Sequence, residues 1–228
     1  MELVSIEIAD KVAKITLSNG KVNAISHQVV EELNAALDQA EEAKAVVIIT
    51  GQPGILSGGY DLKTMQKSMD SAMALVTEGS KLTRRIASFP FPIIAACPGH
   101  AVAKGAFILL CCDYRIGTEG AFKIGLNEVA IGMTMHHAGI EMARNRIPTN
   151  YLNRAVINAE MFDPENAVLA GFLDKVVAAD QLMAEAETVA AQLKKINMRA
   201  HHATKLKVRK AELEIMDKAI EVDSTSSL

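Results

Sequence analysis

The amino-acid sequence predicts an α/β fold in which strands and helices alternate along the chain. Runs that are almost wholly apolar, "AVVIIT" at 45–50 and "PIIAAC" at 92–97, are typical of fully buried strands. A glycine-rich or small-residue loop and then a predicted helix follow each run. The chain has 228 residues, half of them hydrophobic, which suits a single domain with a sizeable core.

The first half of the chain opens with a hairpin. Alternating apolar residues at 4–8 and 12–17 flank the short polar turn "ADK", which is the pattern of two antiparallel strands. Ser26 can cap the helix that follows. After the strand at 45–50, another helix is predicted over about 71–88, because the prolines of "FPFP" cannot continue it. The apolar stripe of the first helix is formed by Val29, Val30, Leu33, Leu37 and Ala40.

The second half of the chain repeats this order and ends in helices. The residues "FILLCC" at 107–112 form the body of an apolar helix, and "DYRIG" after it is a short strand. Helical patterns follow Gly132, and "LDKVV" at 173–177 is the last strand. We predict a core of residues 1–180 and a helical region of residues 181–228. That region should hold two amphipathic helices for packing or assembly and a frayed tail, "DSTSSL".

Composition and charge exclude several classes of protein. A net charge of −3 and an isoelectric point near 6.1 give no sign of nucleic-acid binding. The apolar run "AFILLCC" at 106–112 is far shorter than the ~20 residues that cross a bilayer. The acidic, alternating N-terminus lacks the pattern of a signal peptide, and three cysteines without metal-type spacing indicate reduced thiols. We expect a cytoplasmic protein without nucleic-acid or membrane partners.

Several familiar motifs of catalysis and binding are missing. The chain has neither the G-x-x-x-x-G-K-[ST] phosphate loop nor G-x-G-x-x-G, and "GILSG" differs by one position from the spacing of a nucleophile elbow. Adjacent histidines at 136–137 and 201–202 point apart on a helix, whereas zinc ligands favour positions one helical turn apart. We therefore expect neither a serine hydrolase nor a metal site.

Two small-residue loops each follow a buried strand, "SGGYDL" at 57–62 and "PGHAVAKGA" at 98–106. Loops of this composition allow main-chain N–H groups to face a ligand oxygen, above all where a helix begins just afterwards. Two such donors can build an oxyanion hole. Ordinary turn chemistry explains the same glycines equally well.

The stretch "KIGLNEVAIGM" at 123–133 contains a single carboxylate, Glu128, among apolar residues. Because charged side chains are rarely buried without a partner, this glutamate either faces solvent or is kept for a chemical purpose. From the residues alone, a solvent-facing glutamate at a helix start or strand edge is the more common arrangement.

Four motifs follow one another along the chain: "NAIS", "LSGGYDLK", "SFPFPIIAACPGHAVAKGA" and "CCDYRIG…FKIGLNEVAIG". In order and content they resemble the crotonase (enoyl-CoA hydratase/isomerase) superfamily, and the resemblance extends over residues 2–180. It implies an α/β fold, a crotonase-like spiral of repeated β-β-α turns with a helical C-terminal region. It also implies an acyl-CoA substrate, no separate cofactor, and assembly as a homotrimer or a dimer of trimers.

Two main-chain N–H groups hold the thioester oxygen in that superfamily. The resemblance assigns the first N–H to Tyr60 and the second to Lys104, where the family commonly has glycine. If the loop requires a positive φ angle at this position, a lysine there costs ~1–2 kcal/mol. The N–H of Gly105 is the alternative donor.

Hydratases of the superfamily use two glutamates, and the resemblance matches only the second of them, with Glu128. Phe107 occupies the first position. One carboxylate is enough to move a double bond, because it can carry a proton from one carbon to another. The motifs are most similar to those of Δ3,Δ2-enoyl-CoA isomerases, and we expect this activity. A weak hydratase, a thioester hydrolase and a non-catalytic acyl-CoA-binding protein are the alternatives.

The resemblance also indicates residues that contact CoA or the acyl group. C-terminal lysines of the family often meet the CoA phosphates, and Lys205 in "HATK" is the candidate. Asp61 can cap the helix that begins at Leu62, and His136 can shape the acyl pocket or start a packed helix. The full set of candidates is Ala24, Ser57, Gly58, Gly59, Asp61, Leu62, Phe107, His136 and Lys205.

Overall fold

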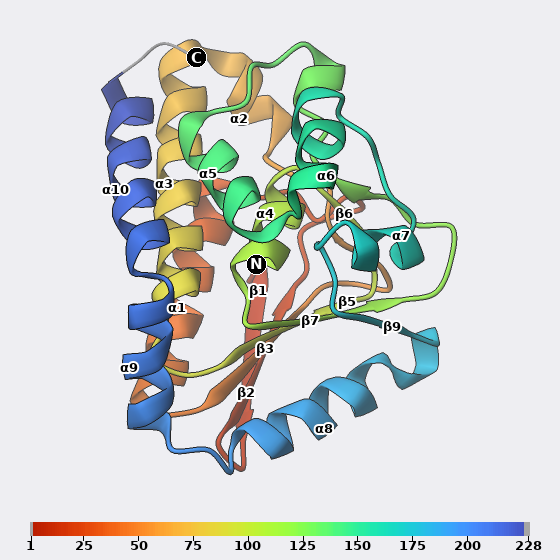
Figure 1. Ribbon diagram of the computed structural model, residues 1–228, viewed down its shortest axis with the longest axis vertical. Helices are drawn as coiled ribbons and strands as arrows, with labels where there is room; N and C mark the ends of the chain where they lie inside the picture. Colours follow the sequence, from red (N-terminus) through yellow and green to blue (C-terminus); the bar gives the residue numbers. More distant parts are fainter. Residues whose placement is uncertain (1, 226–228) are drawn as a thin grey trace.

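The computed structural model describes residues 2–225, which form two sheets surrounded by helices (Figure 1). Neighbouring strands pair in parallel except β1 and β2, which form the predicted antiparallel hairpin with Val4 opposite Leu17. The larger sheet has the order β1 (Val4–Ala9), β2 (Val12–Leu17), β3 (Val46–Thr50), β5 (Ile93–Cys97), β7 (Tyr114–Thr118) and β9 (Lys175–Val177). The smaller sheet has the order β4 (Gly54–Ser57), β6 (Gly99–Val102) and β8 (Ile124–Gly125).

Two helices begin at the capping residues that the sequence indicates. The Ser26 side chain accepts a hydrogen bond from Val29 N, and the Asp61 side chain accepts one from Thr64 N. The helices of the described region are α1 (His27–Glu42), α2 (Leu62–Lys67), α3 (Met69–Ser88), α4 (Lys104–Cys111), α5 (His137–Arg146), α6 (Thr149–Leu152), α7 (Pro164–Leu169), α8 (Leu182–Leu193), α9 (Met198–Val208) and α10 (Lys210–Thr225). Short 3-10 segments lie at Val129–Ile131 and Ala179–Gln181, and a π-helical segment lies at Asn153–Ile157.

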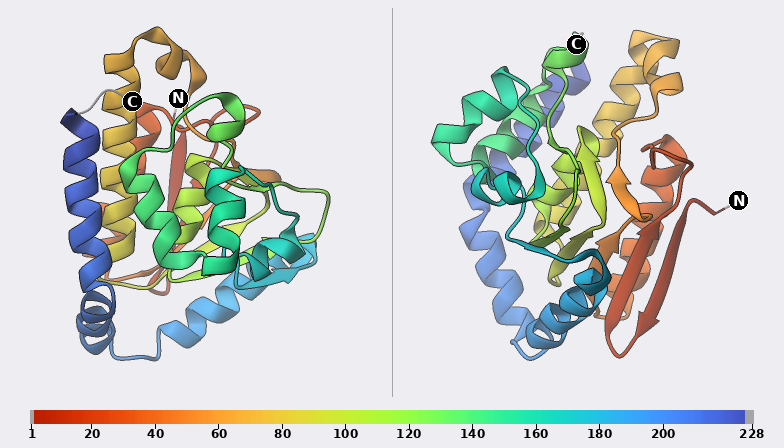
Figure 2. Two further views of the ribbon diagram at one scale, coloured as in Figure 1. Left: turned by 45° about the horizontal axis from the view of Figure 1, so that its top comes forward. Right: turned by 90° about the vertical axis from the view of Figure 1, so that its right-hand side faces the viewer.

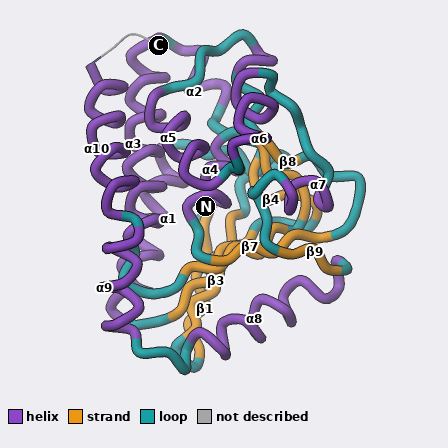
Figure 3. Tube along the Cα trace, viewed as in Figure 1, coloured by secondary structure: helices purple, strands orange, loops and turns teal. Residues whose placement is uncertain are grey.

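The chain winds as a spiral of repeated turns. In each of three successive turns, one strand joins the larger sheet, the next joins the smaller sheet, and helical segments lead back: β3–β4 with α2 and α3, β5–β6 with α4, and β7–β8 with the helices from α5 on. Each turn therefore adds one strand to the smaller sheet, in the order of the chain. Figure 3 shows this sheet beside α6 and α7. This arrangement confirms the predicted α/β spiral.

The larger sheet separates two apolar layers. Val47 and Ile49 of β3 face the main core beneath α1, α3 and α4, whereas Val46 and Ile48 face Leu182 and its neighbours on α8. Alternate residues of this buried strand thus pack into the two layers on opposite faces of the sheet. Figure 1 shows α8 crossing below β7 and β9, and the right-hand view of Figure 2 shows the hairpin at the opposite edge from α5 and α6.

The structure corrects the prediction that residues 57–62 and 98–106 are only loops. Ser57 is the last residue of β4, and residues 99–102 form β6. Both segments therefore contain residues of the smaller sheet. Strands of four residues that contain glycine show no measurable alternation of apolar and polar residues, which is why the sequence did not reveal them.

The C-terminal region also differs from its prediction. Residues 181–225 contain three helices, α8, α9 and α10, rather than the two predicted. The tail was predicted to fray, yet Asp223 is buried in α10 and accepts hydrogen bonds of 2.8 Å from His137 N and Ala138 N. Residues 226–228 of that tail lie outside the described residues. The division between a core and a helical region at residue 180 stays a prediction.

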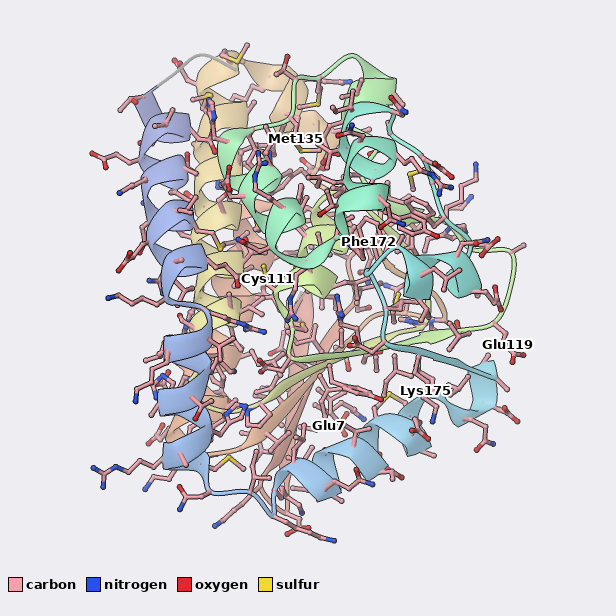
Figure 4. The ribbon with its side chains drawn as sticks, in the orientation of Figure 1. Glu7, Cys111, Glu119, Met135, Phe172 and Lys175 are labelled. Carbon is pink, nitrogen blue, oxygen red and sulfur yellow. The ribbon has the colours of Figure 1, made fainter. Side chains whose placement is uncertain are left out.

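The three cysteines are unpaired and buried, as predicted, and Figure 4 labels Cys111 on α4. No helix between residues 2 and 225 has the length and apolarity needed to cross a membrane.

Candidate active site

The three strands of the smaller sheet end at one edge, because they run parallel. Tyr60 lies three residues after the end of β4, Lys104 two residues after β6, and Glu128 three residues after β8. The carboxyl edge of a parallel sheet is where α/β proteins commonly bind their ligands. Tyr60, Lys104 and Glu128 are far apart in sequence, and all three follow strands that end at this edge.

The loops after β4 and β6 lie in contact. A Cβ atom added to Gly59, whose φ is +108°, would lie 3.1 Å from Ala103 Cβ and 3.8 Å from Lys104 N. The loop after β6 is also tied to β8, because Ala103 N donates a hydrogen bond of 3.0 Å to Gly125 O. The segments carrying all three residues are therefore held together by the main chain.

The N–H groups of Tyr60 and Lys104 are unpaired, since neither donates a hydrogen bond within residues 2–225. Lys104 is the first residue of α4, and the first bond of this helix runs from Phe107 N to Ala103 O. Helix-start N–H groups have no partner within their own helix. Two main-chain donors therefore lie on adjoining loops.

The predicted backbone strain at Lys104 is absent. The positive φ angle of this loop, +51°, falls on Ala103 instead. Gly105 is needed for packing, because a Cβ atom there would lie 2.5 Å from Ser57 O and 3.0 Å from Ser57 Cβ. The absence of that Cβ lets the start of α4 approach the end of β4. The alternative use of the Gly105 N–H as a donor stays a prediction.

Glu128 is buried, with 7% of its surface exposed, so the solvent-facing alternative is wrong. Its Oε2 has no hydrogen-bond partner within residues 2–225. Burial raises the pKa of this carboxyl to about 7, which makes it a stronger base than an ordinary glutamate. Of the apolar residues that flank it, Ile124 and Leu126 are buried, whereas Val129 and Ile131 are 45% and 55% exposed.

Glu128 acts electrostatically on the residue that carries the first N–H. Burial raises the pKa of the Tyr60 phenol, and the negative charge of Glu128 raises it further. Glu128 and Tyr60 therefore lie near enough for their charges to interact. A base beside two free N–H donors can remove a proton from a carbon next to a carbonyl group and stabilise the resulting oxyanion.

Phe107 and His136 pack against each other beside this site. Their ring centroids lie 5.4 Å apart in an edge-to-face arrangement, and Phe107 is fully buried in α4. His136 Nε2 has no partner within the described residues, and burial lowers the pKa of the imidazole to about 4, so that it is neutral at neutral pH. Met135, which precedes it, is labelled in Figure 4. The Phe107 side chain can neither donate nor accept a proton. The His136 imidazole is uncharged at neutral pH.

Sequence comparison agrees with this geometry. Residues 7–226 match the family described as enoyl-CoA hydratase/isomerase. The chain belongs to the enoyl-CoA hydratase/isomerase family. The predicted resemblance to the crotonase superfamily is thereby confirmed.

Known relatives in this family bear both names. Mitochondrial enoyl-CoA delta isomerase 1 of Mus musculus is 30% identical over 226 residues, which cover 97% of this chain and 78% of that protein. A probable enoyl-CoA hydratase of Bacillus subtilis is 37% identical over 145 residues. That match covers 62% of this chain and 56% of the Bacillus protein.

Solved structures of the family are similar over nearly the whole chain. An enoyl-CoA hydratase/isomerase family protein from Pseudomonas syringae is 65% identical with a TM-score of 0.98, covering 99% of this chain and 98% of that one. The enoyl-CoA isomerase of Mycobacterium tuberculosis is 35% identical with a TM-score of 0.94, covering 99% of each chain. The chain is therefore an acyl-CoA enzyme of the enoyl-CoA hydratase/isomerase family.

Six of the predicted CoA-binding residues, Ala24, Ser57, Gly58, Gly59, Asp61 and Leu62, lie on two neighbouring segments. Gly58 N donates to Val22 O at 2.8 Å, and Ile25 N donates to Gly59 O at 2.8 Å, so the segment containing Ala24 runs beside the first loop. The Ser57 hydroxyl stays inside this loop, where it accepts a hydrogen bond of 3.1 Å from Gly59 N. The structure brings these candidates together, and their contacts with CoA stay predictions.

Asp61 and Leu62 begin α2 at the end of the same loop. The Asp61 carboxylate accepts hydrogen bonds from Thr64 N at 2.9 Å and from Thr64 Oγ1 at 2.8 Å, which is the predicted helix cap. Leu62 is 61% exposed, so its side chain is accessible to a ligand.

Lys205 has a different position from the one its prediction requires. Its ammonium group is buried and donates to Asp113 Oδ2 at 2.6 Å, Phe89 O at 2.9 Å and Phe91 O at 3.2 Å. Asp113 directly precedes β7, and Phe89 and Phe91 precede β5, so all three lie at amino ends of strands of the larger sheet, whereas the candidate residues follow the carboxyl ends of strands of the smaller sheet. Because three internal oxygens already satisfy the ammonium, we correct the predicted phosphate contact of Lys205 to a structural ion pair.

Residues of α3 were missed by the sequence analysis. The Lys104 side chain extends into the core, where Nζ donates to Gly79 O at 2.5 Å and to Thr83 Oγ1 at 3.1 Å. An isolated glycine within a helical pattern, such as Gly79, often marks a close approach, and this signal was present in the sequence.

Proposed function

We propose that this enzyme is a Δ3,Δ2-enoyl-CoA isomerase, which converts a 3-enoyl-CoA into the conjugated 2-enoyl-CoA. One observation carries the proposal: Glu128 is a buried carboxylate with an unpartnered oxygen, at the same strand edge as two free main-chain N–H groups. Those N–H groups belong to Tyr60 and Lys104.

The reaction takes two proton transfers. The Glu128 carboxylate removes a proton from C2, and the electrons of the C2–H bond form a dienolate whose oxygen accepts hydrogen bonds from the two N–H groups. The Glu128 carboxylic acid then returns the proton to C4, and the double bond comes to lie between C2 and C3. Substrate and product are isomers, so the balanced reaction consumes no water, oxidant or reductant.

The raised proton affinity of Glu128 supports this role. A carboxyl whose pKa is about 7 matches the weakly acidic carbon better than an ordinary glutamate does, yet it is still largely ionised slightly above neutral pH. General-base assistance contributes ~10²–10⁴-fold to the rate. Each oxyanion donor contributes ~3 kcal/mol.

Phe107 supports isomerisation over hydration. Hydration of a double bond requires a water that is oriented and deprotonated while a proton is delivered to carbon. The phenyl group of Phe107 is fully buried and offers no oxygen to hold such a water. Glu128 is then the only carboxylate that our proposal requires.

The test is conversion of a short 3-enoyl-CoA, followed by the ultraviolet absorbance of the conjugated product, with chromatography to detect any 3-hydroxyacyl-CoA. We expect the native enzyme to form the 2-enoyl-CoA and Glu128→Gln to lose at least ~10²-fold in kcat. Glu31→Gln, which alters an exposed glutamate of α1, is the matched control and should leave kcat unchanged. A native enzyme that forms only the hydroxy product, only free CoA, or no product contradicts the proposal.

Three further expectations stay predictions. They are the homotrimer or dimer of trimers, the cytoplasmic location and the lack of a separate cofactor. Light scattering coupled to size-exclusion chromatography measures the first directly.

A further inference from the structure

Lys104 has an unusual side-chain environment. The residue is fully buried, although lysine is rarely buried without an acidic partner. Its Nζ donates instead to the main-chain oxygen of Gly79 and to the Thr83 hydroxyl, both on α3. Burial lowers the pKa of this amine to about 7. An amine that is costly to bury thus lies in the core, and both of its hydrogen bonds go to the neighbouring helix α3.

Tyr60 reaches the same part of α3. Its Oη donates to Val76 O at 3.4 Å, and its ring covers Gly79 so closely that a Cβ atom added there would lie 2.2 Å from Oη. The Lys104 Nζ lies 5.7 Å from the centre of the Tyr60 ring. The two side chains therefore meet on α3 at Val76, Gly79 and Thr83, which we name the α3 anchor.

The two residues whose N–H groups are free are also the two residues fastened to the α3 anchor. A main-chain N–H has no rotatable bond of its own, so its direction follows from the placement of the residue. Main-chain hydrogen bonds from Ile25 N to Gly59 O at 2.8 Å and from Asp61 N to Ile25 O at 2.9 Å hold one side of Tyr60, and the loop before it contains two glycines that add no stiffness of their own. The helix α3, with 20 residues, holds the side chain of Tyr60 on the other side.

We propose that Lys104 and Tyr60 are positioning residues whose side chains, by holding to the α3 anchor, set the spacing and direction of the two oxyanion-hole N–H groups. This inference rests on the proposed function, because it takes those N–H groups as the oxyanion hole. In this arrangement the side chain of Lys104 holds the residue that carries the second N–H donor against α3.

The physical reason is the sensitivity of transition-state stabilisation to geometry. Displacing a catalytic group by ~1 Å costs about 10²-fold in rate. Removing the Lys104 amine leaves α4 packed by its apolar residues but frees its first turn to shift relative to α3. Binding of the CoA part, which this contact does not touch, should change little.

The experiment combines kinetics with a spectroscopic probe. Lys104→Met keeps the length and the apolar stem and removes the amine, and Thr83→Val removes one of its acceptors while keeping the lysine. Lys81→Met removes an exposed lysine of the same helix and is the control for lost charge. The probe is 2,4-hexadienoyl-CoA, whose absorption moves to longer wavelength when hydrogen bonds polarise its thioester carbonyl.

We expect the native protein and Lys81→Met to shift the bound probe equally. Lys104→Met should lose most of this shift and about 10-fold or more of kcat, with KM changed less than about threefold, and Thr83→Val should lose less of both. A Lys104→Met or Thr83→Val protein that is folded by circular dichroism and keeps the full shift and kcat overturns the inference. So does a native protein that binds the probe without a shift.

These outcomes separate the inference from the proposed function. If the native protein shifts the probe but does not isomerise a 3-enoyl-CoA, the proposed function fails. Loss of the shift in Lys104→Met then still supports the positioning role.

Discussion

Replacement of Glu128 by glutamine should stabilise the folded protein above neutral pH. Burial raises the pKa of this carboxyl from 4.5, its ordinary value, to about 7 in the folded state. A carboxyl with the higher pKa in the folded state binds its proton more tightly there, so its contribution to stability is fully present below pH ~4.5 and is lost as the pH rises through ~7. Glutamine carries no charge at any pH and has no such loss.

The size of the effect follows from the two pKa values. A difference of one in pKa corresponds to ~1.36 kcal/mol. The change from 4.5 to about 7 therefore costs the native protein about 3 kcal/mol of unfolding free energy at high pH. The advantage of Glu128→Gln over the native protein should be near zero at pH ~4 and should grow to about 3 kcal/mol at pH ~8.

Urea denaturation, followed by circular dichroism at several pH values between ~4 and ~8, measures this difference. Other titrating groups, including the buried Lys104, occur in both proteins and largely cancel. The exposed Glu31→Gln variant is the control, and its curve should run parallel to that of the native protein. If the Glu128→Gln curve also runs parallel, the carboxyl is not held in an environment that favours its neutral form, and the reasoning about its strength as a base is refuted.

Two further substitutions test the packing of the site and the reassignment of a lysine. Gly105→Ala should lower the unfolding free energy by ~1–3 kcal/mol and reduce kcat, because its Cβ would lie 2.5 Å from Ser57 O; wild-type values in urea denaturation and steady-state kinetics would contradict the close approach. Lys205→Met should cost ~3 kcal/mol of stability by breaking the buried pair with Asp113, although Arg209 still pairs with that carboxylate at 3.2 Å, and should leave KM for acyl-CoA unchanged. A large rise in KM with unchanged stability would instead restore the predicted contact of Lys205 with the CoA phosphates.

Local patterns were sufficient for the longer elements of the fold. The hairpin, the buried strand at 46–50 and the helix capped by Ser26 all lie where the apolar spacing and the capping residue predicted them. The smaller sheet was missed because its strands have two to four residues, which is too short for any periodicity to show. The glycines revealed the two loops at 57–62 and 98–106, but not the strands β4 and β6 that position them.

The candidate site was predictable in its parts but not in its assembly. Family motifs singled out Tyr60, Lys104 and Glu128, and the parallel strands before them bring their segments to one edge. Which way the Lys104 side chain turns could not be read from its own loop, because its acceptors lie on a helix that begins 35 positions earlier in the chain. The role of Lys205 was mistaken for the same reason, since Asp113 lies 92 positions away.

The sequence by itself determined the longer strands and helices, the family of the chain and the identity of its one suitable carboxylate. These follow from the spacing of apolar residues and from residue types, which are local properties. Only the tertiary structure decided that Glu128 is buried with an unpartnered oxygen, that Ala103 rather than Lys104 takes the positive φ angle, and that the Lys104 amine is fastened to α3. Burial and proton affinity depend on what surrounds a group, and most of those surroundings come from distant parts of the chain.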